Sequence, residues 1–177
     1  MEIIFVRHTK VAIPSGICYG STDVDVAETF YEEAQKVKSK LDNYRFNEVY
    51  TSPLTRAKKL ATYCGYPNAI VDKRISEFDF GDWELRSYDD LYASDPVFLE
   101  WCDDYINKRS PNGESLKDQI RRVQSFISDI TSIGLMRVCV FCHGGVLAIA
   151  QGLSQGIKME DAFKNIPPFG SIIRCEF

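Results

Sequence analysis

His8 and His143 are the only two histidines in this chain of 177 residues. The first follows Arg7 after an apolar run at residues 3–6, and the second directly follows the run at residues 138–142. Short apolar runs of this kind predict buried strands of a parallel sheet. Ligands of such sheets bind beyond the carboxyl ends of the strands, so we expect the two imidazoles to share one site.

Two arginines are predicted to lie on the same rim. Arg7 closes the first strand, and Arg56 falls in the first turn of a helix that is predicted to begin at Ser52-Pro53, with the serine as N-cap. Guanidinium groups match the geometry of phosphate oxygens, and the free N–H groups of helix N-termini carry partial positive charge. Each residue by itself is more often structural, but four phosphate-binding residues on one rim predict a site for a phosphoryl group.

The elements that must position these residues alternate between strands and helices. Apolar residues at helical spacing predict helices over 30–41 and 116–130, the second opened by a capping box of Ser115 and Asp118. A further helix is predicted from residue 146, and strands are predicted at residues 3–6, 47–52, 69–75, 138–142 and 172–177. We therefore predict an α/β fold, a three-layer α/β/α sandwich with a mostly parallel central sheet and a catalytic rim at the strand C-terminal ends.

Length and composition limit the class of protein. We expect a single domain over residues 1–177, with an insertion or lid at about residues 79–112, which end in a turn signal. The net charge of −4 argues against a chain-wide surface for nucleic acid or anionic membrane. No run approaches a membrane span of about 20 apolar residues or a signal-peptide core, so we expect a cytoplasmic protein without a membrane partner. The oligomeric state is left open.

The cysteines and short motifs do not indicate a cofactor. The six cysteines are expected to be free thiols. Cys139 and Cys142 form a CxxC pair, but residues three apart in a strand point to opposite faces, which disfavours a shared metal ion. There is no HExxH, GxxxxGK[ST] or GxGxxG motif. We therefore expect neither a metal nor an organic cofactor.

Five short motifs, taken together, resemble those of the histidine phosphatase superfamily, which also contains the phosphoglycerate mutases. They are Arg7-His8-Thr9, Ser-Pro-Leu-Thr-Arg-Ala at 52–57, Glu-x-x-x-Gly-x-Trp-Glu at 77–84, Pro-Asn-Gly-Glu-Ser at 111–115, and His143-Gly144-Gly145. Each motif is weak alone, but five in the family's order over residues 3 to about 152 are specific. The chain departs from the family at Val26, Thr29-Phe30 and Leu85, positions that bear on substrate choice rather than on the chemistry.

The resemblance implies a role for each matched residue. His8 would attack phosphorus and form a phosphohistidine. Arg7, Arg56 and His143 would hold the nonbridging oxygens. Glu77 would protonate the leaving alkoxide and then deprotonate the attacking water. The chain would therefore be a phosphatase that hydrolyses a phosphoric monoester of a small metabolite.

Further residues are expected to contact the substrate. Residues 16–23, together with the Arg-His-Thr motif, resemble the corresponding segment of one group of phosphatases in the family. The resemblance implies contacts with substrate or phosphate from Thr9, Tyr19, Gly20, Ser21, Thr22 and Gly144. The rings of Tyr19, Phe80, Trp83 and Trp101 could also stack on an aromatic substrate, although core packing is the commoner role of each.

Two alternative functions remain open. A phosphotransferase of the phosphoglycerate mutase type must protect its phosphohistidine from water with a closing lid. The predicted insertion of about thirty residues is smaller than that of the family's cofactor-dependent mutases, which favours hydrolysis. A non-catalytic module that binds a phosphorylated ligand would lack the nucleophile or the acid, and this sequence contains both.

Overall fold

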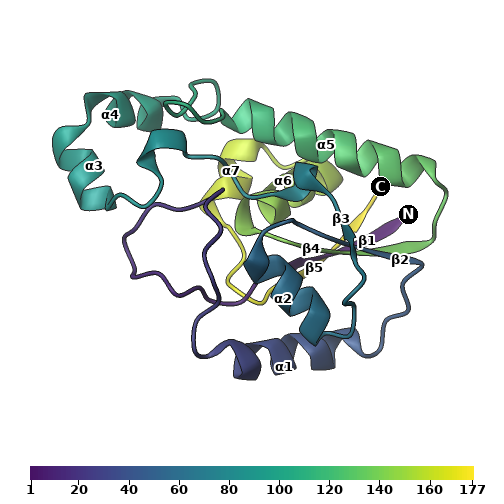
Figure 1. Cartoon of the computed structure of the whole chain (residues 1–177). Coiled ribbons are helices and arrows are strands. Elements are labelled where there is room, and N and C mark those ends of the chain that lie inside the picture. The colour runs from purple at the N-terminus through teal and green to yellow at the C-terminus, as the bar shows by residue number, and fades with distance from the viewer.

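The computed structural model describes residues 1–177 and contains a five-stranded sheet with helices on both faces (Figure 1). The strands are β1 (Glu2–Arg7), β2 (Glu48–Thr51), β3 (Ile70–Val71), β4 (Arg137–Cys142) and β5 (Ile172–Glu176). Their order in the sheet is β3-β2-β4-β1-β5. The pairs β2–β3, β2–β4 and β1–β4 are parallel, and only β5 runs antiparallel, beside β1. The predicted α/β fold with a mostly parallel sheet is confirmed.

The chain contains seven helices, and those that cover the sheet lie in two groups, one on each face (Figure 1). The seven helices are α1 (Phe30–Leu41), α2 (Thr55–Tyr63), α3 (Tyr88–Ser94), α4 (Pro96–Asp103), α5 (Leu116–Ser132), α6 (Gly144–Gln155) and α7 (Met159–Lys164). Ile4 and Val6 of β1 pack in a buried cluster with α1 and α2, whereas Ile3 and Phe5 pack in another with α5 and α6. Because alternate residues of β1 enter opposite clusters, both faces of this strand are apolar, which explains its uninterrupted apolar run.

The helix and strand signals of the sequence are confirmed at most positions. α1 buries its predicted apolar stripe, and α5 begins with the capping box of Ser115 and Asp118. Cys139 lies in the cluster under α1 and α2, and Cys142 lies in the cluster under α5 and α6, so they occupy opposite faces of β4. All six cysteines are unpaired thiols.

Two local predictions were wrong. α2 begins at Thr55 with Leu54 as its N-cap, and Ser52 lies before the helix. The Ser52 hydroxyl is instead hydrogen-bonded to the ring of His143, at 2.7 Å. The strand predicted over residues 69–75 contains only the two residues of β3, because the Asp72 side chain accepts the N–H of Arg74 and begins a 3₁₀ turn.

Residues 79–112 form a distinct cluster to one side of the sheet, where α3 and α4 appear in Figure 1. Trp83 and Phe98 are buried at its centre, with their ring centroids 5.1 Å apart. Tyr88 and Trp101 of this segment line a cavity that also contains the residues following β1. The segment therefore forms one wall of the region beyond the carboxyl ends of the strands.

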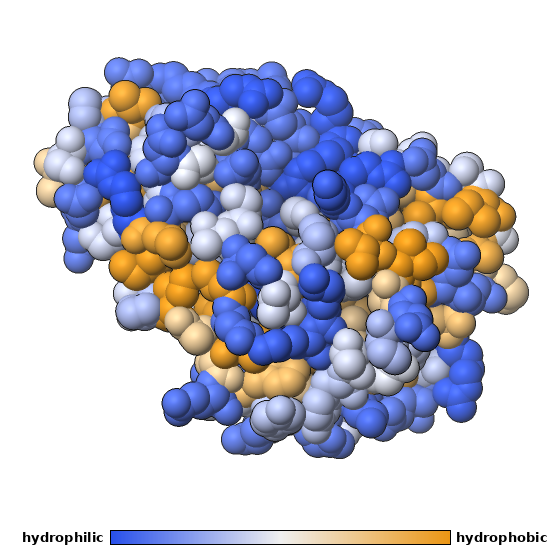
Figure 2. Space-filling model, viewed as in Figure 1, coloured by the Kyte–Doolittle hydropathy of each residue, from blue (hydrophilic) through white to orange (hydrophobic).

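None of the helices has the length and apolar character needed to cross a lipid bilayer. On the face shown in Figure 2, hydrophilic residues predominate and hydrophobic residues gather in separate small patches.

Candidate active site

His8 and His143 lie side by side because their strands are neighbours in the sheet. β1 and β4 are paired in parallel with Arg7 opposite Cys142, so the next residue of each strand leaves the sheet at the same edge. The ring centroids of the two histidines are 5.2 Å apart, and both side chains are buried. The structure thus brings together the two imidazoles that lie 135 positions apart in the sequence.

The His8 ring is oriented by the backbone of the next residue. Its Nδ1 lies 2.7 Å from the carbonyl oxygen of Thr9. Since a carbonyl only accepts, Nδ1 must carry the hydrogen and Nε2 keeps its lone pair. Burial, followed by the charges of Arg56 and Arg7, lowers the pKa of His8 to about 3. At neutral pH the Nε2 atom is therefore unprotonated, as a nucleophile must be.

His143 is the N-cap residue of α6 and has no exposed surface. The Oγ of Ser52 accepts the backbone N–H of Leu54, so its hydroxyl hydrogen can be donated to Nε2 of His143. That arrangement leaves the ring hydrogen on Nδ1, which is buried without a partner. Burial and the neighbouring charge of Arg56 lower the pKa of His143 well below its usual value. The ring is therefore a neutral donor.

Arg7 is held between the last loop of the chain and the start of α6. Its guanidinium donates to the carbonyl of Pro167, and its Cζ lies 4.2 Å from the ring centroid of Phe169. A Cβ atom on Gly144 would lie 2.9 Å from Cζ of Arg7. Glycine at this position therefore allows the first turn of α6 to approach the guanidinium.

Arg56 is fully buried in the first turn of α2. Its two terminal nitrogens donate to the carbonyl oxygens of Gly20 and Thr22, the latter at 2.9 Å. Its Cζ lies 5.5 Å from the ring centroid of Tyr19. The segment around residue 20 therefore fixes the direction of the guanidinium.

Several buried donors around His8 have no hydrogen-bond partner within the protein. They include Nε of Arg7, Nε of Arg56, Nδ1 of His143 and Oγ1 of Thr9. Two of these atoms belong to guanidiniums, and the N-terminus of α6 adds partial positive charge. Charge-assisted hydrogen bonds to such donors contribute about 1.5–3 kcal/mol each. The arrangement is suited to a phosphoryl group.

Glu77 lies beside this group and lines the same cavity. Its Oε1 accepts the backbone N–H of Phe78 at 2.9 Å and Nε2 of Gln119 at 3.0 Å. Its Oε2 accepts the backbone N–H of Gly145 at 3.1 Å. A carboxyl group held in this way at the cavity wall can give a proton to a bound ligand or take one from it.

Three residues that were predicted to contact substrate bind the side chain of Glu84 and do not line the cavity, and neither Arg56 nor His143 lines it. The carboxylate of Glu84 accepts the backbone N–H groups of Gly20, Ser21 and Thr22. This loop is therefore folded around an internal anion, and none of the three residues lines the cavity. Its observed contact with the site is through the two carbonyls that bind Arg56.

A cavity of about 270 Å³ opens at His8. Its aromatic lining comprises Tyr19, Phe78, Phe80, Tyr88, Trp101, Tyr105 and Phe163. Of the four rings that the sequence suggested for stacking, those of Tyr19, Phe80 and Trp101 line the cavity. Trp83 is fully buried in the cluster of α3 and α4 and does not line the cavity.

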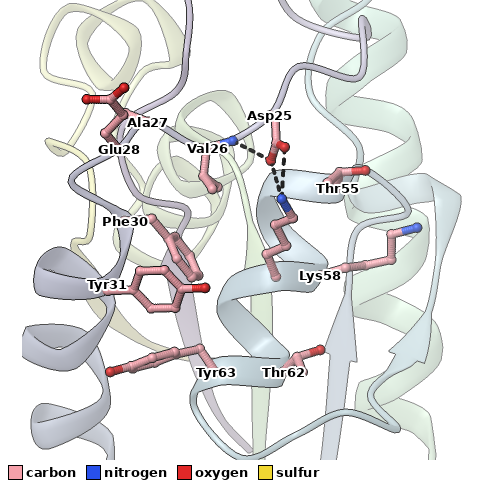
Figure 3. A pocket seen from close by; sticks show the side chains of 11 residues that line it. Asp25, Val26, Ala27, Glu28, Phe30, Tyr31, Thr55, Lys58, Thr62 and Tyr63 are labelled. Atoms are coloured by element: carbon pink, nitrogen blue, oxygen red, sulfur yellow. Dashed lines mark hydrogen bonds and ion pairs between the residues drawn. The ribbon is translucent and has the colours of Figure 1, made fainter.

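A larger cavity of about 650 Å³ lies between α1 and α2 (Figure 3). Lys59 and Asp25 form an ion pair there, with Nζ–O distances of 2.6 and 2.8 Å. The aromatic rings of Phe30, Tyr31 and Tyr63 lie on the other side of it (Figure 3). None of the predicted catalytic residues lines this cavity, whereas Arg7, His8 and Glu77 line the smaller one.

The sequence did not identify three residues that shape the site. Pro167 and Phe169 hold Arg7, and the signal that could have indicated a loop at this place is the Pro-Pro-Phe-Gly run that contains them. Gln119 contacts Glu77. It could have been found as a polar residue in the apolar stripe of α5, three positions after Leu116.

Comparison with known proteins extends the resemblance to nearly the whole chain. The model of a family described as histidine phosphatase superfamily (branch 1) matches residues 3–177. A Hydrogenobacter thermophilus protein assigned as phosphoserine phosphatase 2 is 28% identical over 165 residues, which cover 90% of this chain and 81% of the relative. The adenosylcobalamin/alpha-ribazole phosphatase of Salmonella typhimurium is 30% identical over 156 residues, or 84% of this chain and 77% of the relative. The crystal structure of the alpha-ribazole phosphatase from Shigella flexneri has a TM-score of 0.90 at 24% identity, covering 100% of this chain and 91% of that chain.

Proposed function

This chain belongs to the histidine phosphatase superfamily, and from that premise we propose that it is a phosphomonoesterase with a phosphohistidine intermediate at His8. The observation that carries the proposal is the neutral Nε2 of His8, whose lone pair is kept available by the bond between Nδ1 and the Thr9 carbonyl. Arg7, Arg56 and His143 each have an unpartnered donor, the ring of His143 lies 5.2 Å from that of His8, and the charges of both arginines act on His8. A nucleophile among cationic donors is the arrangement that phosphoryl transfer needs.

The proposed reaction has two steps. In the first, Nε2 of His8 attacks phosphorus, the bond from phosphorus to the ester oxygen breaks, and Glu77 gives its proton to the leaving alkoxide. In the second, Glu77 takes a proton from a water molecule that attacks the phosphohistidine, and the bond between phosphorus and nitrogen breaks. Inorganic phosphate leaves, and both residues return to their starting states. Arg7, Arg56 and His143 stabilise the charge on the transferring group in both steps.

Trapping the intermediate tests this function. The protein is mixed with a phosphorylated substrate carrying labelled phosphorus and quenched, and the label is mapped by peptide analysis. We expect an acid-labile, base-stable adduct at His8, and no adduct or turnover in the variant His8→Ala. Label at His143, or turnover by His8→Ala, would overturn the assignment.

We further propose that the substrate carries an aromatic or otherwise apolar leaving group, with α-ribazole phosphate as the leading candidate. The aromatic lining of the cavity supports this, because rings stacked on a substrate contribute about 0.5–1.5 kcal/mol per pair beyond the area they bury. The name of the Salmonella typhimurium relative points the same way.

The mutase alternative is less well supported by the cavity. A phosphoglycerate carries a carboxylate in addition to its phosphate, and its recognition calls for a further cation. Arg7 is the only arginine or lysine lining the cavity, and its guanidinium is directed by Pro167 and Phe169. The serine released from phosphoserine carries a carboxylate and an ammonium group. Its carboxylate would likewise need a further cation that the cavity lining does not supply.

A panel of substrates separates these possibilities. We expect kcat/KM for α-ribazole phosphate to exceed that for phosphoserine and 3-phosphoglycerate by about tenfold or more, the equivalent of one or two stacked rings. Transfer of phosphate between the hydroxyls of phosphoglycerate, faster than its hydrolysis, would instead establish a mutase. Binding of phosphorylated ligands without any phosphoenzyme would establish a non-catalytic module.

We propose that the protein binds its small phosphorylated substrate and neither nucleic acid nor a membrane. We also propose that it is located in the cytoplasm. The six unpaired thiols fit a reducing compartment. The net charge of −4 suits neither nucleic acid nor an anionic membrane surface.

A further inference from the structure

Gln119 is a fully buried polar side chain of α5 that faces the proposed acid and base. Its Nε2 donates to Oε1 of Glu77 over 3.0 Å. Its own Oε1 is buried without a partner. A buried carbonyl that lacks a hydrogen bond destabilises the fold, so a glutamine retained for packing would be expected to satisfy both ends of its amide. The contact with Glu77 accounts for its place in the apolar stripe.

The hydrogen bonds to Glu77 are divided unequally between its two oxygens. Oε1 accepts two, from the backbone N–H of Phe78 and from Gln119. Oε2 accepts one, from the backbone N–H of Gly145. Each carboxylate oxygen has two lone pairs. Oε1 is therefore saturated, whereas Oε2 keeps one lone pair for a proton.

Gly145 and the side chains of Glu77 and Gln119 are packed too closely for the two side chains to change places. A Cβ atom on Gly145 would lie 2.5 Å from Oε1 of Glu77 and 2.9 Å from Nε2 of Gln119. A carboxylate only accepts, so the amide of Gln119 must present its nitrogen to Oε1. The donor is thus held in place by packing as well as by its hydrogen bond.

We propose that Gln119 is a positioning residue that directs the proton of Glu77 to Oε2 by occupying Oε1. The proposal rests on the function proposed above, in which Glu77 exchanges a proton with the leaving group. The bond between Oε2 and hydrogen breaks as the alkoxide gains that hydrogen, while phosphorus exchanges its ester oxygen for Nε2 of His8. Gln119 touches neither phosphorus nor the leaving group and acts through Glu77.

Two substrates that differ in their need for a proton test this role. The alkoxide released from 2-phenylethyl phosphate must be protonated, whereas 4-nitrophenolate leaves without a proton, and both present an aromatic ring to the cavity. Because kcat/KM covers only the steps up to formation of the phosphoenzyme, hydrolysis of that intermediate does not enter. For Gln119→Met, we expect kcat/KM for 2-phenylethyl phosphate to fall about tenfold, a part of the roughly 10²–10⁴-fold that acid catalysis contributes, and that for 4-nitrophenyl phosphate to change by less than about twofold.

Gln124→Met is the matched control, because Gln124 lies on the exposed side of the same helix. This variant is expected to keep the wild-type ratio of the two kcat/KM values. An equal fall for both substrates in Gln119→Met would show a structural role, and no fall for either would show no role, so each result overturns the proposal. Inactivity of the wild-type protein, or activity of His8→Ala, would instead overturn the proposed function.

Gln119→Glu supplies a second variant of nearly the same shape. A protonated carboxyl at position 119 can donate to Oε1 of Glu77, whereas an ionised one cannot. We therefore expect kcat/KM for 2-phenylethyl phosphate, relative to wild type, to recover as the pH is lowered from about 8 to about 5. A constant ratio over this range would contradict the proposal even if Gln119→Met does not fold.

The phosphate of the substrate titrates near about pH 6, equally in wild type and variant, so its effect cancels in the ratio of the two. The protein groups whose charge acts on Glu77 keep that charge over this range of pH. They are the guanidiniums of Arg7 and Arg56, the phenol of Tyr19 and the thiol of Cys142. Burial raises the pKa values of the phenol and the thiol, and arginine stays charged. The pKa of His8 is lowered to about 3, so this ring also stays neutral. Recovery of the relative kcat/KM of the Gln119→Glu variant would thus show protonation of the carboxyl group at position 119.

Discussion

At the scale of single residues, positive charge and nucleophilicity are assigned to different side chains. Burial lowers the pKa values of His8 and His143, and the neighbouring guanidiniums lower them further, so both rings are neutral. Arginine cannot lose its proton under these conditions. The permanent charges of Arg7 and Arg56 therefore also keep the proposed nucleophile unprotonated.

The neutral histidines are expected to make stability depend on pH. In the unfolded chain a histidine takes up a proton near about pH 6.5. In the folded protein the pKa of His8 is lowered to about 3, so the unfolded state binds more protons between these values. The free energy of unfolding is then constant above about pH 6.5 and falls on acidification by up to about 1.4 kcal/mol per pH unit for each such histidine.

Urea denaturation at a series of pH values measures this slope. Between about pH 6 and 4, the free energy of unfolding of the variant His8→Gln should fall less steeply than that of the wild type. The difference in slope should approach the contribution of one histidine, about 1.4 kcal/mol per pH unit. Equal slopes in the wild type and the variant would show that His8 is not held neutral by the fold.

The buried guanidinium of Arg56 is expected to be irreplaceable by an ammonium group. Its terminal nitrogens donate to Gly20 and Thr22 while Nε remains without a partner. Lysine has a single nitrogen and cannot serve these separate directions. Arg56→Lys should lower kcat/KM by about 10²-fold, the usual cost of losing one preorganised donor. The same substitution at the exposed Arg45 should leave kcat/KM unchanged, and equal values for the two variants would contradict the role of Arg56.

At the scale of elements, the turn from β4 into α6 positions much of the site. It carries His143 as the N-cap and allows the helix to begin between Arg7 and Glu77. Gly144 faces the guanidinium, and the N–H of Gly145 binds the carboxylate. Because Gly144 and Gly145 have no side chains, the guanidinium of Arg7 and the carboxylate of Glu77 can both approach this helix end.

Gly145→Ala should therefore impair catalysis by displacing Glu77. The added Cβ would lie 2.5 Å from Oε1 of Glu77. A shift of about 1 Å in a reacting group can cost about 10²-fold in rate, and we expect a fall of that size in kcat/KM for an alkyl phosphate. Gly152→Ala in the same helix is the control, because its Cβ would meet the flexible Met159 side chain. Wild-type kcat/KM in Gly145→Ala would show that the contact is not needed.

At the scale of the whole molecule, segments far apart in the sequence are joined by Arg122 of α5. Its terminal nitrogens donate to the backbone carbonyls of Arg74, Ser76 and Glu77 at 2.8, 2.6 and 2.9 Å. The same guanidinium binds the carboxylate of Glu114, with the closest pair of atoms 2.6 Å apart. The chain segment that carries Glu77 is thereby fastened to α5 and to the turn before it.

Removal of this connection should destabilise the protein strongly. Arg122→Met removes the donor of three backbone carbonyls and leaves the mostly buried carboxylate of Glu114 without its cation, which typically costs about 3–5 kcal/mol of unfolding free energy. Arg121→Met removes an exposed ion pair with Asp118 and should cost less than about 1 kcal/mol. Urea denaturation of the two variants gives both values. Similar losses in the two variants would contradict a central role for Arg122.

The sequence could predict those features that depend on neighbouring residues. Apolar runs identified β1 and β4, helical spacing identified α1 and α5, and the capping box of Ser115 identified the start of α5. The N-cap signal of Ser52 failed because its hydroxyl is bound to His143, which lies 91 positions away. A local pattern contains no information on a competing partner at that distance.

By itself, the sequence determined the α/β class, the placement of His8, His143 and Arg7 at the ends of strands and of Arg56 at the start of a helix, and the motifs that resemble those of the histidine phosphatases. Only the tertiary structure decided that both imidazoles are neutral, that Gln119 binds Glu77, and that Trp101 lines the cavity while Trp83 is buried in the core. The reason is physical: periodicity reports the local backbone, whereas pKa, burial and hydrogen-bond partners arise from contacts between distant segments.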